Sequence, residues 1–231
     1  MAVDYNNDGW LDFYEANDNY DGNLFYKNNG DSTFTEVSFT NGTHMELDAM
    51  GLGVGDFDGD LDFDIHITDR FTDSKLLRNN GDGTYTEVGG QHNLEYVGGF
   101  GWGNNFFDAD LDGDHDMYIS GTHFPFFSAL PSLLYVNNGQ AWFNPDTLEN
   151  DSLYSGTNAI FDFNNVRKPD IVSLNADNIP NSVWSNTTPI STPRFSIRLV
   201  GCSSNRDAIS STITAYDGQE SRAWMTHSTQ S

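Results

Sequence analysis

The sequence predicts an all-β fold, a β-propeller with four recognisable blades of about 52 residues. An acidic loop recurs at a nearly constant interval, and its four copies begin 52, 52 and 54 residues apart. A turn built around Asn-Asn-Gly follows each of the first three copies at a similar distance. No stretch of ten residues has helical periodicity, so short strands are the expected elements. The acidic loops are 4–12 (loop one), 56–64 (loop two), 108–116 (loop three) and 162–170 (loop four).

Each unit has the same order of elements. A segment of aromatic and β-branched residues follows the acidic loop, and we expect it to be a strand. These segments are 13–14, 65–67 and 117–119. An Asn-Asn-Gly turn comes next, because asparagine and glycine readily adopt the positive φ that hairpin turns need. The turns are 28–30, 79–81 and 137–139, with a decayed fourth copy at 183–186.

Two further features complete the unit. A Thr-aromatic-Thr-Glu-Val segment follows the first two turns, at 33–37 and 84–88. Alternating glycines at 51–55 and 99–103 precede loops two and three, where glycine permits another backbone to approach closely. About four strands in roughly 50 residues is the size and content of a propeller blade.

The acidic loops predict calcium sites. They share Asp at position 1, Asp or Asn at position 3, Asp or Val at position 5, and Asp at position 9. Calcium binds six to eight oxygens. Alternate residues of a tight turn can aim side chains at one point, and a backbone carbonyl near position 7 adds another oxygen. The alternative is a set of solvated Asp/Gly turns, but the spacing repeats as well as the composition.

Loop four is expected to bind calcium weakly or not at all. It keeps Asp162, Asn164 and Asp170, but Val166 removes one oxygen. Arg167 and Lys168 add positive charge beside the loop.

The loops and the turns after them resemble FG-GAP/VCBS repeats over roughly residues 1–188. The resemblance implies an integrin-α-like β-propeller, usually of seven blades, whose loops bind calcium. By this resemblance the side-chain ligands are the residues at positions 1, 3, 5 and 9. The position-7 residues Trp10, Asp62 and Asp114 are included because a backbone carbonyl near position 7 is expected to add an oxygen. The candidate ligands are therefore Asp4, Asn6, Asp8, Trp10, Asp12, Asp56, Asp58, Asp60, Asp62, Asp64, Asp108, Asp110, Asp112, Asp114 and Asp116.

The C-terminal part is a separate segment. We expect propeller blades at 1–188, a linker at 189–194 and a partial β segment at 195–231. The last segment resembles the start of an ASPIC/UnbV domain. The combination is similar to the cartilage acidic protein family, whose members are typically secreted calcium-binding proteins.

Charge and side-chain chemistry exclude several functions. The net charge of −24 disfavours nucleic acid and anionic membranes as partners. No apolar run is long enough to span a membrane. The six histidines lack the spacing of zinc hydrolases, and His115 is expected to be a solvated loop residue. Residues 1–160 contain only four basic side chains, which argues against a catalytic site.

The leading hypothesis is an extracellular or cell-surface calcium-binding propeller that acts as an adhesion or interaction module and is not an enzyme. Its partner would be a protein or a glycan. The alternatives are a secreted polysaccharide lyase or hydrolase built on a calcium propeller, and a lectin-like module. The five tryptophans could stack on sugars, but we expect them to pack inside the blades.

We also expect the chain to be a fragment of a larger propeller whose secretion signal and further blades lie upstream. It begins at loop one, so the strand that should precede Asp4 is expected to be missing. A closed ring of four blades is the alternative.

Overall fold

The computed structural model describes residues 1–97, 99–122, 130–151, 154–176, 178–190, 197, 199–200, 211–216, 218 and 221–225. The described chain is all-β, as predicted. Its two helices have four residues each, α1 (Ser38–Asn41) and α2 (Gly89–His92). No helix among the described residues has the length and apolar character needed to cross a membrane.

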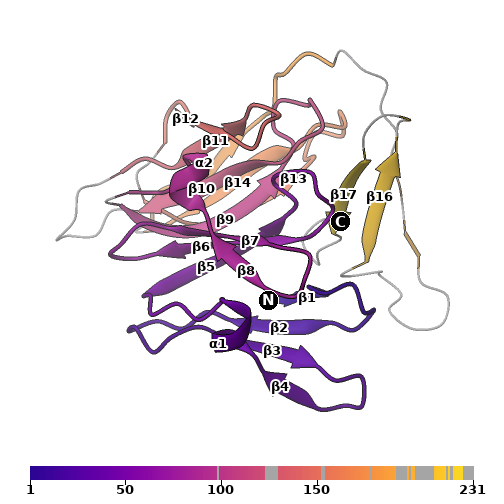
Figure 1. Cartoon of the computed structure of the whole chain (residues 1–231). Coiled ribbons are helices and arrows are strands. Elements are labelled where there is room, and N and C mark those ends of the chain that lie inside the picture. The colour runs from indigo at the N-terminus through magenta and orange to yellow at the C-terminus, as the bar shows by residue number, and fades with distance from the viewer. Residues whose placement is uncertain are drawn as a thin grey trace.

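The strands form four small antiparallel sheets and one hairpin (Figure 1). In every sheet, each strand pairs with the next one along the chain. Sheet 1 contains β1 (Ala2–Val3), β2 (Asp12–Glu15), β3 (Leu24–Asn28) and β4 (Phe34–Glu36). Sheet 2 contains β5 (Ala49–Gly55), β6 (Asp64–Asp69), β7 (Lys75–Asn79) and β8 (Tyr85–Glu87). Sheet 3 contains β9 (Phe100–Phe107), β10 (Asp116–Thr122), β11 (Leu133–Asn137) and β12 (Phe143–Thr147). Sheet 4 contains β13 (Ser155–Phe161), β14 (Asp170–Asn175) and β15 (Ser182–Trp184), and the hairpin contains β16 (Thr212–Tyr216) and β17 (Ser221–Met225).

These sheets follow the repeat found in the sequence. The segments expected to be strands after the first three acidic loops are β2, β6 and β10. One expectation is wrong, because a strand does precede Asp4. Residues Ala2 and Val3 pair with Phe13 and Asp12, so the first unit also has four strands. The fourth unit has three strands among its described residues.

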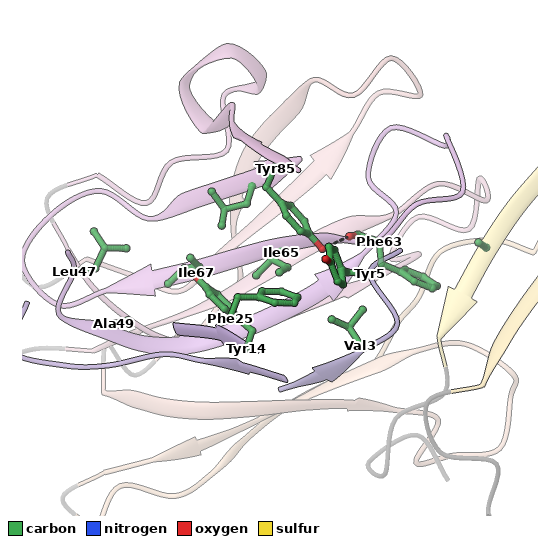
Figure 2. Packing of buried hydrophobic residues seen from close by; sticks show 12 residues of the cluster. Val3, Tyr5, Tyr14, Phe25, Leu47, Ala49, Phe63, Ile65, Ile67 and Tyr85 are labelled. Carbon is green, nitrogen blue, oxygen red and sulfur yellow. Dashed lines mark hydrogen bonds between the residues drawn. The ribbon is translucent and has the colours of Figure 1, made fainter. Parts of the chain in front are cut away.

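The hydrophobic core lies between consecutive sheets. One cluster joins sheets 1 and 2 (Figure 2), a second joins sheets 2 and 3, and a third joins sheets 3 and 4. Strand β10 shows how the chain fills two of them. Met117 and Ile119 belong to the second cluster, and Tyr118 between them belongs to the third. Successive side chains of a strand point to opposite faces, so the apolar run at 117–119 contributes to the clusters on both sides of its sheet.

Glycine lets the first strands of sheets 2 and 3 approach each other closely, as the sequence predicted. A Cβ added at Gly51 would lie 2.3 Å from the carbonyl oxygen of Trp102. At Gly53 it would lie 2.1 Å from Oδ1 of Asn104. Both distances are too short for any side chain, so β5 and β9 can pack in this way only because glycine is present at these positions.

The outer faces of sheets 1 and 4 carry exposed apolar side chains. Phe13 and Phe34 lie on sheet 1 with their rings 5.2 Å apart, and Leu174 and Val183 lie on sheet 4. Within the described ranges, no hydrophobic cluster joins sheet 1 to sheet 4. The number of blades and the closure of a ring therefore stay predictions.

Most of the predicted C-terminal segment lies outside the described residues. The predicted linker 189–194 is described only at 189–190, and the segment 195–231 mainly through the β16–β17 hairpin. The residues that carry the ASPIC/UnbV resemblance at 204–209 are not among those described.

Candidate metal centre

Each acidic loop connects the first strand of a sheet to the second. Neighbouring loops touch one another along one edge of the stack of sheets. The side-chain amide of Asn7 in loop one donates to Oδ1 of Asp62 in loop two at 2.9 Å. Loop two in turn contacts loop three, where Nδ1 of His115 lies 3.1 Å from the amide nitrogen of Asp56. The repeat thus brings its acidic loops side by side.

The aspartate at position 9 is fully buried in all four loops. In loop three, one carboxylate oxygen of Asp116 accepts the N–H of Ala109 at 2.6 Å, and the other accepts the N–H of Asn137 at 2.8 Å. The position-9 aspartates of the other three loops accept the same two bonds. One comes from the N–H of the residue at position 2, and the other comes from the N–H of the first or only asparagine in the turn that follows. These aspartates are Asp12, Asp64 and Asp170. This carboxylate therefore fixes the loop whether or not a metal is bound.

In the second, third and fourth units, the asparagine that holds position 9 also connects its sheet to the preceding one. The side-chain amide of Asn79 donates to the carbonyl of Tyr5 at 2.8 Å, and that of Asn137 donates to the carbonyl of Phe57 at 2.9 Å. Asn186 donates in the same way to Ala109 at 2.7 Å. Each acceptor is the backbone carbonyl of the position-2 residue in the acidic loop of the preceding unit. The sequence showed the recurrence of these asparagines but gave no sign of this contact.

Three carboxylates converge in loop two and three in loop three. In each set, oxygens of the residues at positions 1, 3 and 9 lie within 4.8 Å of one another. The two sets are Asp56, Asp58 and Asp64, and Asp108, Asp110 and Asp116. The position-5 residues Asp60 and Asp112 interact with the position-3 residues of their own loops. Of the four side chains expected to converge in each of these loops, those at positions 1, 3 and 9 form the set, and the position-5 residues Asp60 and Asp112 are not part of it.

Loops one and four differ from loops two and three. Neither belongs to a set of three acidic side chains among the described residues, because both have asparagine at position 3. Their position-1 carboxylates bond to the loop backbone in the same way. Asp4 accepts the N–H groups of Asp8 and Gly9, and Asp162 accepts those of Val166 and Arg167. In this respect loop one resembles loop four, although the sequence grouped it with loops two and three.

The side chains at position 7 lie beside the glycine of the following turn. A Cβ added at Gly30 would lie 3.0 Å from the Trp10 indole nitrogen. Added at Gly81, it would lie 2.9 Å from a carboxylate oxygen of Asp62, and at Gly139 3.5 Å from one of Asp114. The acidic side chains of Asp62 and Asp114 are in neither converging set. This placement is compatible with the expectation that position 7 contributes a backbone oxygen.

Burial makes the ionised form of these carboxylates unfavourable. It raises the pKa of Asp12 and of Asp56 to about 6, and that of Asp116 to about 8. Burial also raises the pKa of Asp64 well above its ordinary value. Hydrogen bonds from backbone N–H groups oppose the shift in each case. A divalent cation would reverse it, because the cation attracts the charged form.

The donor set fits a hard cation. The converging atoms are carboxylate oxygens, which calcium and magnesium prefer, and neither set includes a histidine or cysteine ligand. Calcium accepts irregular geometry and more ligands than magnesium, which demands a near-ideal octahedron. In loop three the side chains of Asp108, Asp110 and Asp116 would hold the ion, and in loop two those of Asp56, Asp58 and Asp64.

Two expectations about individual side chains are wrong. His115 was expected to be solvated, but it is buried, and its Nδ1 lies 2.9 Å from the carbonyl oxygen of Asp56. The tryptophans were expected to pack inside the blades, but Trp10, Trp102 and Trp142 are 41–51% exposed. Trp184 is partly buried and its indole N–H donates to the carbonyl of Glu149, and the side chain of Trp224 lies outside the described residues.

Comparison with known proteins identifies one repeat. Residues 4–67 match the model of the FG-GAP-like repeat family. The matched segment runs from loop one to β6 and so includes all of loop two. The search of curated proteins finds no match to this chain. The chain therefore contains an FG-GAP-like repeat, in agreement with the repeat type suggested by its sequence.

Proposed function

We propose that the protein is a calcium-binding β-propeller that acts outside the cell as an adhesion or interaction module and is not an enzyme. The observation that carries the proposal is the recurrence of one carboxylate cluster at equivalent positions of two consecutive units. Three acidic oxygens lie within 4.8 Å of one another in each. An FG-GAP-like repeat covers the first of these clusters. A single acidic cluster could be accidental, but two clusters in the same strand-to-strand loop favour a binding site.

The wider context of the proposal comes from the sequence. An integrin-α-like propeller followed by an ASPIC/UnbV-like segment would place the protein near the cartilage acidic proteins. Such a protein would bind a protein or glycan ligand at the cell surface or in the matrix. The charge of the chain favours a partner with a basic surface, because residues 1–190 contain 31 acidic and only six basic side chains.

Calorimetric titration tests the metal site. Calcium added to the full chain, after removal of divalent ions with a chelator, should bind at loops two and three. Asp58→Ala and Asp110→Ala should each remove one site, because each change deletes both the charge and the oxygen ligand from one cluster. Asp82→Ala is the matched control, since Asp82 is an exposed aspartate whose hydrogen bonds go to its own turn. Unchanged binding in both cluster variants would refute the assignment.

A polysaccharide panel tests the non-enzymatic part of the proposal. The protein is incubated with each polysaccharide in the presence of calcium, and both product formation and retention are followed. The proposal predicts no product. Release of shorter chains or unsaturated ends would instead identify a hydrolase or a lyase.

Glycan binding is a second candidate function, and the exposed tryptophans favour it. Trp10 and Trp142 are 51% and 45% exposed, and each is close to an Asn-Asn-Gly turn beside the acidic loops. Exposed aromatic rings can stack on sugar rings. Trp10→Ala and Trp142→Ala should then weaken retention on a polysaccharide. Phe39→Ala, which removes an exposed aromatic ring from α1, should leave it unchanged. Equal retention of all three variants would count against a lectin-like role.

A further inference from the structure

The C-terminal hairpin packs against the edge formed by the acidic loops. Ala223 of β17 is 2% exposed and belongs to the cluster between sheets 1 and 2, together with Val3, Tyr5 and Phe63. Figure 1 shows β16 and β17 beside the stack of sheets, and Figure 2 shows the yellow strand close to Phe63. The hairpin is therefore held by the core and does not stand alone.

The neighbouring residue, Arg222, reaches between loops two and three. Its Nε donates to the carbonyl of Gly113 in loop three at 3.2 Å. Its Nη1 lies over loop two, where a Cβ added at Gly59 would be only 2.9 Å away. Gly59 also has a φ of +77°, so glycine is favoured there by both conformation and space. The guanidinium thus contacts two loops that belong to different sheets.

A buried carboxylate lies in the same pocket. Asp114 is 8% exposed, and neither of its carboxylate oxygens receives a hydrogen bond from a donor in the described part of the chain. It lines a pocket of about 30 Å³ together with Asp56, Asp58, His115 and Arg222. Leaving a buried carboxylate without a donor is expensive. Arg222 is a positively charged side chain that lines this pocket.

The chemistry of the pocket suits a guanidinium group. Its walls offer the carbonyl of Gly113 and carboxylates from two loops, and a guanidinium presents five N–H donors in one plane. An ammonium group is a compact charge without that planar arrangement. The charge distribution is also complementary. Residues 1–190 have a net charge of −25, and Arg222 is one of four basic residues in the remainder, which has three acidic ones.

We propose that the pocket between loops two and three is a guanidinium-binding site, that Arg222 occupies it, and that this contact fastens the C-terminal hairpin across the two loops. The pocket shares Asp56 and Asp58 with the carboxylate cluster of loop two, whereas Asp114 belongs to neither cluster. The contact is therefore tested in chelator, without calcium, so that its outcome is independent of the proposed calcium binding.

Hydrogen exchange of the full chain tests the proposal. Arg222→Ala should make the β16–β17 amides exchange at least about tenfold faster, because an undocked two-stranded hairpin is barely stable in water. Asp114→Asn should do the same without altering the hairpin sequence. It also keeps the backbone carbonyl of residue 114. Arg78→Ala is the matched control, since Arg78 lies on β7 and bonds to Asn80. Amides of β6 report whether each variant remains folded.

Chemical rescue tests the identity of the group. Ethylguanidinium added to the Arg222→Ala variant should restore protection of the hairpin, and ethylammonium should not. The two substitutions should also be non-additive, because Arg222 and Asp114 line the same pocket and changes to neighbouring groups couple. The proposal is overturned if either variant exchanges like the wild type while β6 stays protected. It is also overturned if Arg222→Lys keeps full protection or ethylammonium rescues equally well.

Discussion

The aspartate at position 9 of each loop connects two chain segments before any metal is considered. In loop three, for example, one oxygen of this aspartate accepts a backbone N–H from the loop itself, and the other accepts the N–H of the first asparagine in the Asn-Asn-Gly turn that follows. In loops two and three, the same residue is part of the converging carboxylates. A substitution at position 9 would therefore disturb the fold and the candidate metal site together. Position 3 is the better place to test the metal alone.

Asp110→Ala should abolish calcium binding at loop three and leave the fold of the metal-free protein nearly unchanged. Asp110 is exposed, so the substitution removes a charge from the cluster without emptying buried space. Calorimetry should show one site fewer, and urea unfolding in chelator should differ from the wild type by less than about 0.5 kcal/mol. A large loss of stability in chelator would mean that Asp110 acts mainly in folding.

Asn137→Ala should destabilise the protein by about 1–3 kcal/mol, because it leaves buried carbonyl groups without their donor. Asn137 is 2% exposed, and its side-chain amide donates to Phe57 at 2.9 Å and to His115 at 3.3 Å. Asn138→Ala is the matched control, since Asn138 is exposed and its side chain serves only its own turn. Urea unfolding checks both variants. Equal losses would show that the inter-sheet bond contributes nothing particular.

At the scale of elements, the acidic loop and the Asn-Asn-Gly turn act as one unit. The turn supplies the N–H that holds position 9, and its glycine leaves space for the side chain at position 7. An added Cβ would lie only 3.0 Å from the position-7 side chain at Gly30 and 2.9 Å at Gly81, whereas the 3.5 Å at Gly139 is an ordinary contact.

Calcium binding should tighten as the pH rises from 5 to 8. Burial raises the pKa of Asp56 to about 6 and that of Asp116 to about 8 in the metal-free protein. A carboxyl whose folded-state pKa is raised contributes stability that is fully present below its ordinary pKa, 3.8. That contribution is lost as the pH rises through about 6 for Asp56 and about 8 for Asp116. Calcium needs the ionised form, so its binding releases protons over the same window.

Melting temperatures in calcium and in chelator, compared at pH 5, 6, 7 and 8, check this pH dependence. The difference between the two should widen as the pH rises. A difference that stays constant from pH 5 to pH 8 would contradict the assignment of these carboxylates as ligands.

At the scale of the whole molecule, stability depends on contacts between consecutive sheets. Each hydrophobic cluster joins one sheet to the next, so no sheet has a core of its own. The loops reinforce the same junctions, since Asn79, Asn137 and Asn186 each donate to the preceding loop. A metal that stiffens one loop therefore stabilises the junction beside it.

Calcium should raise the melting temperature of the full chain. A ligand that binds only the native state adds about 2.7 kcal/mol per site at a hundredfold excess over Kd. For a chain of this length, each kcal/mol corresponds to roughly 2–4 °C. Thermal unfolding in calcium and then in excess chelator measures the effect, and magnesium at the same concentration serves as the control. An unchanged melting temperature would indicate that the loops are ordinary turns.

Local patterns in the sequence predicted much of this protein. The period of 52–54 residues, the strands after the first three acidic loops, the glycine-lined β5 and β9, and the positions of the converging carboxylates all follow from short-range spacing. Strand alternation and turn chemistry operate over a few residues, so they can be read from the chain itself. Spacing also predicted the three converging side chains of loops two and three, but it included the position-5 residues Asp60 and Asp112, which are in neither set.

Only the tertiary structure determined how distant segments meet. The bond from Asn137 to Phe57 spans 80 positions, the contact of His115 with Asp56 spans 59, and that of Arg222 with Gly113 spans 109. His115 is buried because a second loop packs over it. Such contacts depend on which sheets become neighbours and how their cores fill, and a residue's own spacing carries no information about either.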